Sequence, residues 1–301
     1  MNWMDPLVLR VHKPAGISSF DIVRKLKRLL PKEVKKIGYF GTLDPFAEGL
    51  LLVALNQANR LTQFVHQDLS KTYVAVGVLG IETKTQDLTD PIIQNDTSDY
   101  FKNVISSFSI SFFQEQLQKF IGTYWQAPPA YSAAKFEGKK LCDWMRSDGI
   151  EIKKEQVERI IYQLKFHAVA FPELTFEVEC SSGTYIRTLF VDMANSMGTI
   201  GSLKNLLRKK IGSVENNSIC IVENILDHID LSIVPLKELL PYPVVCFNKK
   251  QKIDFINGKK WEIPHLDTTY RGIYWVVDDE DKICGLAQQA DNISRVLVGL
   301  H

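Results

Sequence analysis

The residues from Gly41 to Leu55 read GTLDPFAEGLLLVAL and end in the longest uninterrupted apolar run of the chain, Leu50 to Leu55. This run predicts a buried strand from Gly49 to Leu55. The preceding residues, from Gly38 to Pro45, contain glycine and proline too often for regular structure and predict a loop. Asp44 therefore stands on a loop that leads into a buried strand, where a rigid scaffold can present its carboxylate to a ligand.

Taken alone, the Asp44-Pro45 pair has an ordinary structural interpretation, because aspartate before proline is a common helix cap and turn former. A second candidate follows the glycine turn at Gly183, where Arg187 stands at the start of a predicted helix. The alternative for Arg187 is a structural or surface ion pair. Local sequence does not decide between these alternatives for either residue.

Outward from this stretch, the chain alternates predicted strands and helices. Before it, a strand at 7–11 ends in the turn Lys13 to Gly16, and a helix capped by Ser18 or Ser19 runs to Pro31. After it we expect strands at 71–80 and, on either side of Pro172, within 159–181; helices at 114–120, 139–146 and 184–197; and a polar loop at 83–98. Short strands at 244–247, 261–263, 273–277, 283–287 and 295–298 predict a small β-rich unit.

Composition describes an ordinary folded chain: 301 residues, 45% apolar and 24% charged, with a net charge of +1. The longest apolar run is far shorter than the roughly 20 residues of a membrane-spanning helix. Residues 1–12 lack the pattern of a secretory signal. Five cysteines without a CxxC pair indicate neither a zinc site nor a disulfide framework. We therefore expect a cytoplasmic protein without a metal or a membrane partner.

Basic residues gather in four clusters despite the neutral total: 24–36, 135–140, 204–210 and 249–260. Each cluster by itself is typical of a solvated surface. Together they favour contacts with phosphate groups.

Five motifs follow one another along the chain: KPAGISS (13–19), GTLDPFAEGLLL (41–52), Lys71-Thr72-Tyr73, PPAYSAAKFEGKKL (128–141) and SSGTYIRTL (181–189). In this order they resemble the bacterial TruB family of tRNA pseudouridine synthases, from Val8 to about Ser213. The remaining C-terminal segment is similar in length and character to the PUA-like domain of that family. The resemblance implies isomerisation of uridine to pseudouridine at position 55 in the tRNA T-loop, without a cofactor.

The resemblance also assigns catalytic roles. Asp44 is the implied nucleophile, attacking either uracil C6 or the sugar, and Arg187 is the arginine that pairs with it and keeps it ionised. Tyr73 is the tyrosine that stacks on the target base and is a candidate for removing its C5 proton. A phenol has an ordinary pKa near 10, so this second role requires a perturbed environment.

Four further positions match residues that contact the substrate in the family: Tyr39, Tyr185, Leu207 and Lys13. For Tyr185 and Leu207 the alternative is core packing, and for Lys13 it is a structural ion pair. The chain departs from the family at Tyr39, where histidine is usual, at His12, where aspartate is frequent, and at Lys84, which replaces an acid although Asp87 is retained.

The resemblance therefore implies an α+β enzyme: a mixed, mostly antiparallel sheet with flanking helices in residues 1–232, and a small β-rich PUA-like domain in residues 233–301. Periodicity alone predicts only a mixture of helices and strands. The expected partner is the T-loop and stem of tRNA, whose target base is extruded into the site. The expected oligomeric state is a monomer. Two alternatives are a non-catalytic RNA-binding module and a guide-RNA-dependent relative in a ribonucleoprotein; the intact Asp44, Tyr73 and Arg187 set disfavours the first, and the lack of charged tails and docking extensions disfavours the second.

Overall fold

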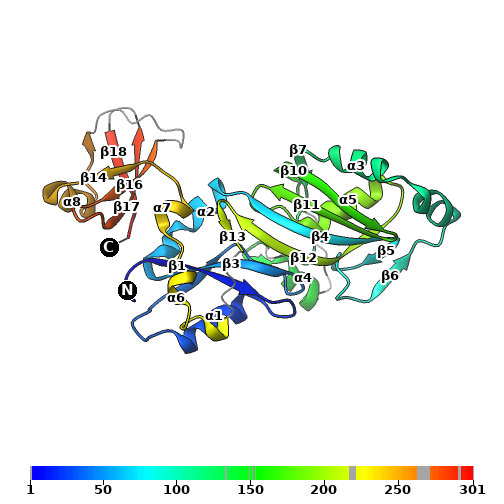
Figure 1. Cartoon of the computed structure of the whole chain (residues 1–301), viewed down its shortest axis with the longest axis horizontal. Helices are drawn as coiled ribbons and strands as arrows, with labels where there is room; N and C mark the ends of the chain where they lie inside the picture. The colour runs from blue at the N-terminus through cyan, green and yellow to red at the C-terminus, as the bar shows by residue number, and fades with distance from the viewer. Residues whose placement is uncertain are drawn as a thin grey trace.

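The structure is a computed structural model that describes residues 2–132, 134–148, 150, 152, 154–216, 222–262, 272–290 and 293–300. Two sheets dominate it, one of nine strands and one of five. Figure 1 shows them side by side along the long axis of the molecule, the smaller one formed by the C-terminal part of the chain.

The larger sheet has the strand order β1-β3-β12-β4-β11-β10-β7, with β2 paired to β3 and β13 to β12. Every pairing is antiparallel except the short contact of β12 with β3. The prediction of a mixed, mostly antiparallel sheet is therefore confirmed. Its strands are β1 (Leu7–Lys13), β2 (Ile37–Phe40), β3 (Glu48–Leu55), β4 (Lys71–Leu79), β7 (Gly122–Gln126), β10 (Val157–Ala170), β11 (Glu173–Cys180), β12 (Gly201–Ile211) and β13 (Val214–Glu215).

Helices flank this sheet. They are α1 (Ser19–Leu29), α2 (Thr62–Asp68), α3 (Ile110–Gln118), α4 (Leu141–Asp148) and α5 (Ile186–Ser196), with shorter helical turns η1 (Asn56–Leu61), η2 (Tyr100–Val104), η3 (Ile105–Ser107) and η4 (Val222–Asn224). Ser18 caps α1 together with Asp21 in a reciprocal capping box, and the helix ends just before Pro31, as its sequence predicts.

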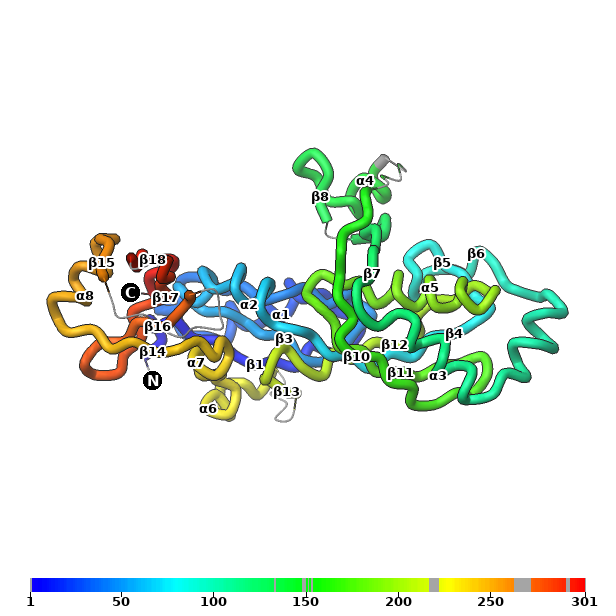
Figure 2. Tube along the Cα trace, turned by 90° about the horizontal axis from the view of Figure 1, so that it is seen from above, coloured from blue at the N-terminus to red at the C-terminus, as the bar shows by residue number. Residues whose placement is uncertain are grey.

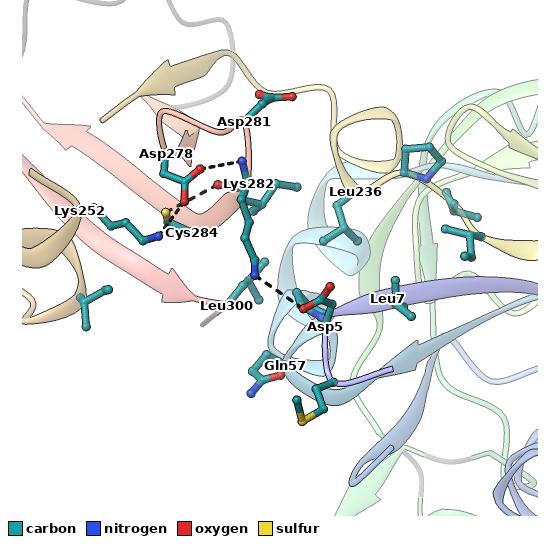
Figure 3. Close-up of a pocket in the computed structure, with 17 residues that line it drawn as sticks. Asp5, Leu7, Gln57, Leu236, Lys252, Asp278, Asp281, Lys282, Cys284 and Leu300 are labelled. Carbon is teal, nitrogen blue, oxygen red and sulfur yellow. Dashed lines mark hydrogen bonds and ion pairs between the residues drawn. The ribbon is translucent and has the colours of Figure 1, made fainter. Parts of the chain in front are cut away.

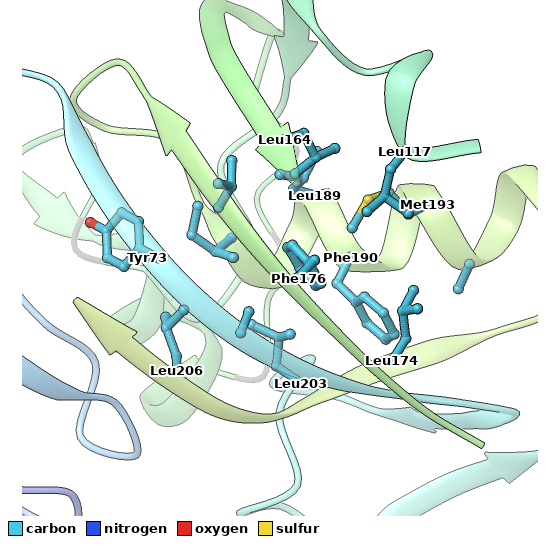
Figure 4. Close-up of a cluster of buried hydrophobic side chains, with 14 of the residues drawn as sticks. Tyr73, Leu117, Leu164, Leu174, Phe176, Leu189, Phe190, Met193, Leu203 and Leu206 are labelled. Atoms are coloured by element: carbon cyan, nitrogen blue, oxygen red, sulfur yellow. The ribbon is translucent and has the colours of Figure 1, made fainter. Parts of the chain in front are cut away.

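The core beneath the centre of the sheet is formed where α5 and α3 cover β4, β11 and β12. Phe176 of β11 stacks on Phe190 of α5, with ring centroids 6.0 Å apart. Figure 4 shows this cluster, with Tyr73 at its edge and the hydroxyl group directed away from the apolar side chains. One end of the core therefore presents a polar group.

Two segments predicted as loops, 38–45 and 83–98, contain strand residues. The expected loop at 38–45 contains the end of strand β2, which pairs antiparallel with β3. Gly38 leaves room there for the side chain of Asn59, whose Oδ1 lies only 2.0 Å from where a Cβ atom would stand. The basic residues at 204–210 lie on strand β12. Within the expected loop at 83–98, the short strand β6 (Ile92–Asn95) pairs with β5 (Ile81–Thr83).

One insertion stands apart from both sheets. Between β7 and β10 the chain forms the small hairpin β8 (Lys135–Phe136) and β9 (Lys139–Lys140), followed by α4. Figure 2 shows this segment projecting from the body of the molecule.

The C-terminal sheet has the order β14-β16-β17-β18-β15. It contains β14 (Val244–Cys246), β15 (Trp261–Glu262), β16 (Ile273–Val277), β17 (Ile283–Ala290) and β18 (Ile293–Gly299), and the unpredicted helix α8 (Lys249–Ile256). Ile263, the end of one expected strand, lies outside the described residues. The small β-rich PUA-like unit is thus confirmed.

Two short helices, α6 (Ile229–Ser232) and α7 (Leu236–Leu239), connect the sheets. Ile233 still pairs with Leu9 of β1, and the Val234 amide donates to the Val8 carbonyl at 2.8 Å. The division between residues 1–232 and 233–301 stays a prediction. None of the helices among the described residues is long and apolar enough to cross a membrane.

Candidate active site

The aspartate loop, residues 41–47, connects β2 to β3 and is held in place from both sides. The buried hydroxyl of Ser19, at the start of α1, accepts a hydrogen bond from the Leu43 amide at 2.9 Å and can donate to the Leu43 carbonyl at 3.1 Å. The side chains of Leu43 and Ala47 are buried in the core under β4 and α5. These contacts fix the backbone on both sides of Asp44.

Lys13 is fully buried beside this loop, and its ammonium group donates to the carbonyls of Pro14, Ile17 and Pro45 at 2.8, 2.7 and 3.3 Å. Burial lowers the pKa of Lys13 to about 8, while the nearby Asp44 carboxylate opposes this shift. Lys13 therefore ties the KPAG turn to the aspartate loop. The geometry favours a structural role over direct contact with a substrate.

Asp44 and Arg187 form the central ion pair of the site. The Nε atom of Arg187 lies 2.8 Å from Oδ2 of Asp44, and the exposed fractions of the two side chains are 4% and 34%. The other guanidinium nitrogens donate to the carbonyls of Thr85 and Tyr131, at 2.5 and 3.0 Å. Arg187 is thus fixed from three sides, while the carboxylate of Asp44 stays accessible.

The accessible face of Asp44 opens on a cavity of about 210 Å³ that Tyr73 and Tyr185 also line. Tyr73 is 7% exposed, and burial raises the pKa of its hydroxyl. Tyr185 precedes α5, and its backbone is clamped by the side chain of Gln126, which donates to its carbonyl at 2.9 Å and accepts from its amide at 2.8 Å. A carboxylate and two aromatic side chains thus face one small pocket.

The floor of this pocket carries cations that sequence reasoning did not identify as functional. Lys71, on β4, lines the pocket and is 4% exposed, and Arg208, on β12, lies directly across from Tyr73 in the sheet and is fully buried. The only signal in the sequence was the place of Lys71 in the Lys71-Thr72-Tyr73 motif. Arg208 had been counted with a surface cluster, because strand register determines which residues face inward.

Of the four expected substrate contacts only Tyr185 lines this pocket, and Lys13, Leu207 and Tyr39 do not. Leu206 lines it, whereas its neighbour Leu207 pairs with Glu48 of β3. Tyr39 lies on β2 and packs against the apolar cluster around α1. Their roles in substrate binding stay predictions.

A larger cavity of about 610 Å³ lies elsewhere, between β1 and the C-terminal sheet. Figure 3 shows Lys252 paired with Asp278, and Lys282 reaching Asp5 across this junction. Its lining also includes Asp281, which pairs with Lys237, and the buried free thiol of Cys284. Among the described residues no group of three or more histidine, cysteine or acidic side chains could hold a metal ion.

Three of the four basic clusters are partly neutralised within the protein. Lys25 pairs with Glu223, Lys209 with Glu177, and Lys259 with Asp254, each at 2.7 Å. Exposed pairs of this kind contribute at most about 1 kcal/mol to stability.

Residues 27–186 match the family model described as TruB family pseudouridylate synthase, N-terminal domain. The tRNA pseudouridine synthase B of Caldicellulosiruptor saccharolyticus is 34% identical over 259 residues, which cover 83% of this chain and 82% of that protein. The tRNA pseudouridine synthase B of Clostridium acetobutylicum is 31% identical over 299 residues, 96% of this chain and 98% of that protein.

The fold has neighbours among solved structures. A chain in the crystal structure of a Cbf5-Nop10-Gar1 complex superposes with a TM-score of 0.71 at 19% identity, covering 99% of this chain and 84% of that one. At this identity the likeness concerns the fold alone. The family match and the sequence relatives go further, and they show that this chain is a member of the TruB family of pseudouridylate synthases.

Proposed function

We propose that this pseudouridine synthase isomerises uridine 55 in the T-loop of tRNA, with Asp44 as the nucleophile. The observation that carries the proposal is the pairing of Asp44 with the buried Arg187 at the mouth of a pocket lined by Tyr73 and Tyr185. The 31–34% identity to proteins named tRNA pseudouridine synthase B supports tRNA as the substrate. We further propose that the protein acts as a cytoplasmic monomer.

The size of the pocket supports a mechanism in which the base is flipped out. Asp44 and Tyr73 lie at a cavity too small for a paired, stacked nucleotide, so the target uridine has to leave its RNA stack. Extruding a base costs a few kcal/mol. Stacking on an aromatic side chain returns about 1–3 kcal/mol per base, and Tyr73 and Tyr185 are the side chains placed to provide it.

Isomerisation requires the base to leave the ribose through N1 and to return through C5. A carboxylate can hold the intermediate covalently, by attack on uracil C6 or on the sugar. Arg187 stabilises that carboxylate before attack and after release, because its three nitrogen contacts keep the guanidinium in place throughout. The geometry is compatible with both routes.

The test replaces Asp44 by asparagine, which keeps its size and polarity. We expect Asp44→Asn to lower turnover of unmodified tRNA by about 10⁴-fold or more, with tRNA affinity within about tenfold since phosphate contacts dominate affinity. Pseudouridine is mapped by primer extension after carbodiimide treatment. The matched control is Glu48→Gln, which removes an exposed carboxylate next to the same loop and should leave turnover unchanged.

Two results would contradict the proposal. Undiminished product from Asp44→Asn would exclude Asp44 as the nucleophile. If the enzyme is given a tRNA with cytidine at position 55 and forms pseudouridine at some other uridine, the proposed target is excluded. Because no guide RNA is added, turnover of tRNA alone also separates this function from that of a guide-dependent relative, and binding without turnover would indicate a non-catalytic module.

A further inference from the structure

Two cations lie under the pocket with no acid to balance them. Arg208 donates from Nε to the Leu50 carbonyl at 2.7 Å and from Nη2 to the Gly41 carbonyl at 3.0 Å, and its buried Nη1 has no hydrogen-bond partner in the described chain. A Cβ atom at Gly41 would stand 3.6 Å from this Nη1 and only 3.0 Å from Nζ of Lys71. Within the described ranges, neither Lys71 nor Arg208 forms an ion pair with a carboxylate. Burial and a neighbouring positive charge both lower the pKa of an ammonium group at this place.

A chain of hydrogen bonds leads from Lys71 to the surface. Its Nζ donates to Oγ of Ser182 at 2.7 Å, and the same oxygen lies 2.9 Å from Nδ1 of His66. A serine hydroxyl can accept one hydrogen bond while it donates another. His66 is exposed on α2 and lines the pocket together with Lys71. The buried amine is thus connected to solvent by two short steps.

The charge states of the groups around the pocket agree with proton transfer along this chain. Burial lowers the pKa of Lys71 to about 7, the Arg208 guanidinium adds to that shift, and the buried Cys180 thiol on β11 opposes it slightly. Burial also lowers the pKa of His66, as do Lys71 and Arg208. Burial raises the pKa of Tyr73. At neutral pH the pocket therefore offers a partly neutral amine beside a protonated phenol.

We propose that Lys71 removes the C5 proton of the rearranged base and passes it to solvent through Ser182 and His66. The inference rests on the proposed isomerisation. The neutral amine takes the hydrogen of C5 as a proton, and the electron pair of that C–H bond becomes the C5–C6 double bond. On the C6 route the bond between C6 and the Asp44 oxygen breaks as this double bond forms, and its electron pair returns to the carboxylate. On the sugar route the electrons of the C6–N1 double bond move to N1. On either route N1 takes up a proton from solvent.

The relay returns Lys71 to its neutral state. The ammonium gives a proton to Oγ of Ser182 while that hydroxyl gives its own proton to Nδ1 of His66, from which water takes it. Within the described ranges no carboxylate is paired with Lys71 or Arg208, so none competes with Ser182 for the proton. Tyr73 remains in this scheme the surface on which the base stacks.

The experiment compares Lys71→Met with Lys71→Arg in single turnovers of unmodified tRNA labelled with tritium at uracil C5. The wild-type rate of tritium release should rise about tenfold per pH unit below pH 7 and level off above it, as the neutral amine accumulates. Both variants should lose about 100-fold or more and lose this pH dependence, because an arginine cannot release its proton. Binding of tRNA, measured separately, should change less than about threefold.

Rescue and the outer relay provide independent readouts. Added methylamine should restore part of the rate of Lys71→Ala, and imidazole should restore Ser182→Ala and His66→Gln. A fully active Lys71→Arg would overturn the inference by showing that only the positive charge matters, and so would a wild-type rate in Lys71→Met. In either case pseudouridine at position 55 made by the wild type, and its loss in Asp44→Asn, would leave the proposed function standing.

Discussion

Lys71 acts as a base in the reaction we propose, but burying its charge destabilises the folded protein. Its pKa lies near 7 in the folded chain against an ordinary value of 10.5. Between these values the unfolded chain holds a proton that the folded chain lacks, so the free energy of unfolding rises with pH. Below pH 7 both states are protonated, and the full cost of burying the charge remains.

Replacing this residue by methionine should therefore stabilise the protein. We expect Lys71→Met to raise the melting temperature at pH 6 by more than about 3 °C, and the difference should shrink as the pH approaches 10. Thermal denaturation followed by circular dichroism measures both effects. Lys71→Arg is the control, because the charge of an arginine does not titrate in this range, so the difference in melting temperature between Lys71→Met and Lys71→Arg should not shrink as the pH rises. A Lys71→Met variant that is less stable than the wild type at pH 6 would contradict the argument.

For single residues, the sequence could predict candidate site residues from motifs, but not which other side chains the fold places beside them. The motifs predict Asp44, Arg187 and Tyr73 as site residues; the structure places Asp44 and Tyr73 in one pocket, with Arg187 paired to Asp44. Arg208 and His66 were missed because nothing local distinguishes them from surface residues. Arg208 faces Tyr73 only through the pairing of β12 with β4, and that register depends on the whole sheet.

Among the elements, β4 and α5 meet at a point with no spare room. A Cβ atom added to Gly77 would lie 2.1 Å from the ring of Phe190, which is itself buried against Phe176. Overpacking of this kind costs typically 1–3 kcal/mol, which is about the loss we expect for Gly77→Ala. Denaturant unfolding measures it. Thr72→Val, on the opposite face of the same strand, should change stability by less than about 0.5 kcal/mol, and equal effects of the two variants would refute this packing.

Elements with strong local signals were predicted well, and those that depend on distant partners were not. The helix α1 has a capping serine, an apolar stripe and a terminal proline, all visible in the sequence. Strand β12 carries Lys204, Arg208, Lys209 and Lys210, so its charge concealed its alternation. Strand β2 is a strand only through its pairing with β3, a contact between separate elements.

For the whole molecule, the two sheets share one core. Leu50 and Ile211 of the larger sheet belong to the same buried cluster as Trp275 and Leu286 of the C-terminal sheet. Two hydrogen bonds also reach this junction, from Trp275 to the Leu240 carbonyl and from Arg60 to the Gly299 carbonyl, both at 2.7 Å. The C-terminal sheet therefore cannot separate without exposing apolar surface of the rest.

We expect a single cooperative unfolding transition, with calorimetric and van't Hoff enthalpies that agree. Leu286→Ala, which should cost about 2–5 kcal/mol, would then lower the midpoint of the whole transition. Differential scanning calorimetry makes the measurement. Two separate peaks, with only one shifted by the substitution, would show that the sheets unfold independently.

The ion pair at the heart of the pocket joins residues 143 positions apart, and the bond from Arg208 to Gly41 spans 167. A ribosome extends the chain from its N-terminus at about 5–20 residues per second. Asp44 consequently emerges many seconds before Arg187, which pairs with it, and before strand β12, which carries Arg208. A nascent chain can therefore contain Asp44 while its site is still incomplete, and the complete site forms only late in translation.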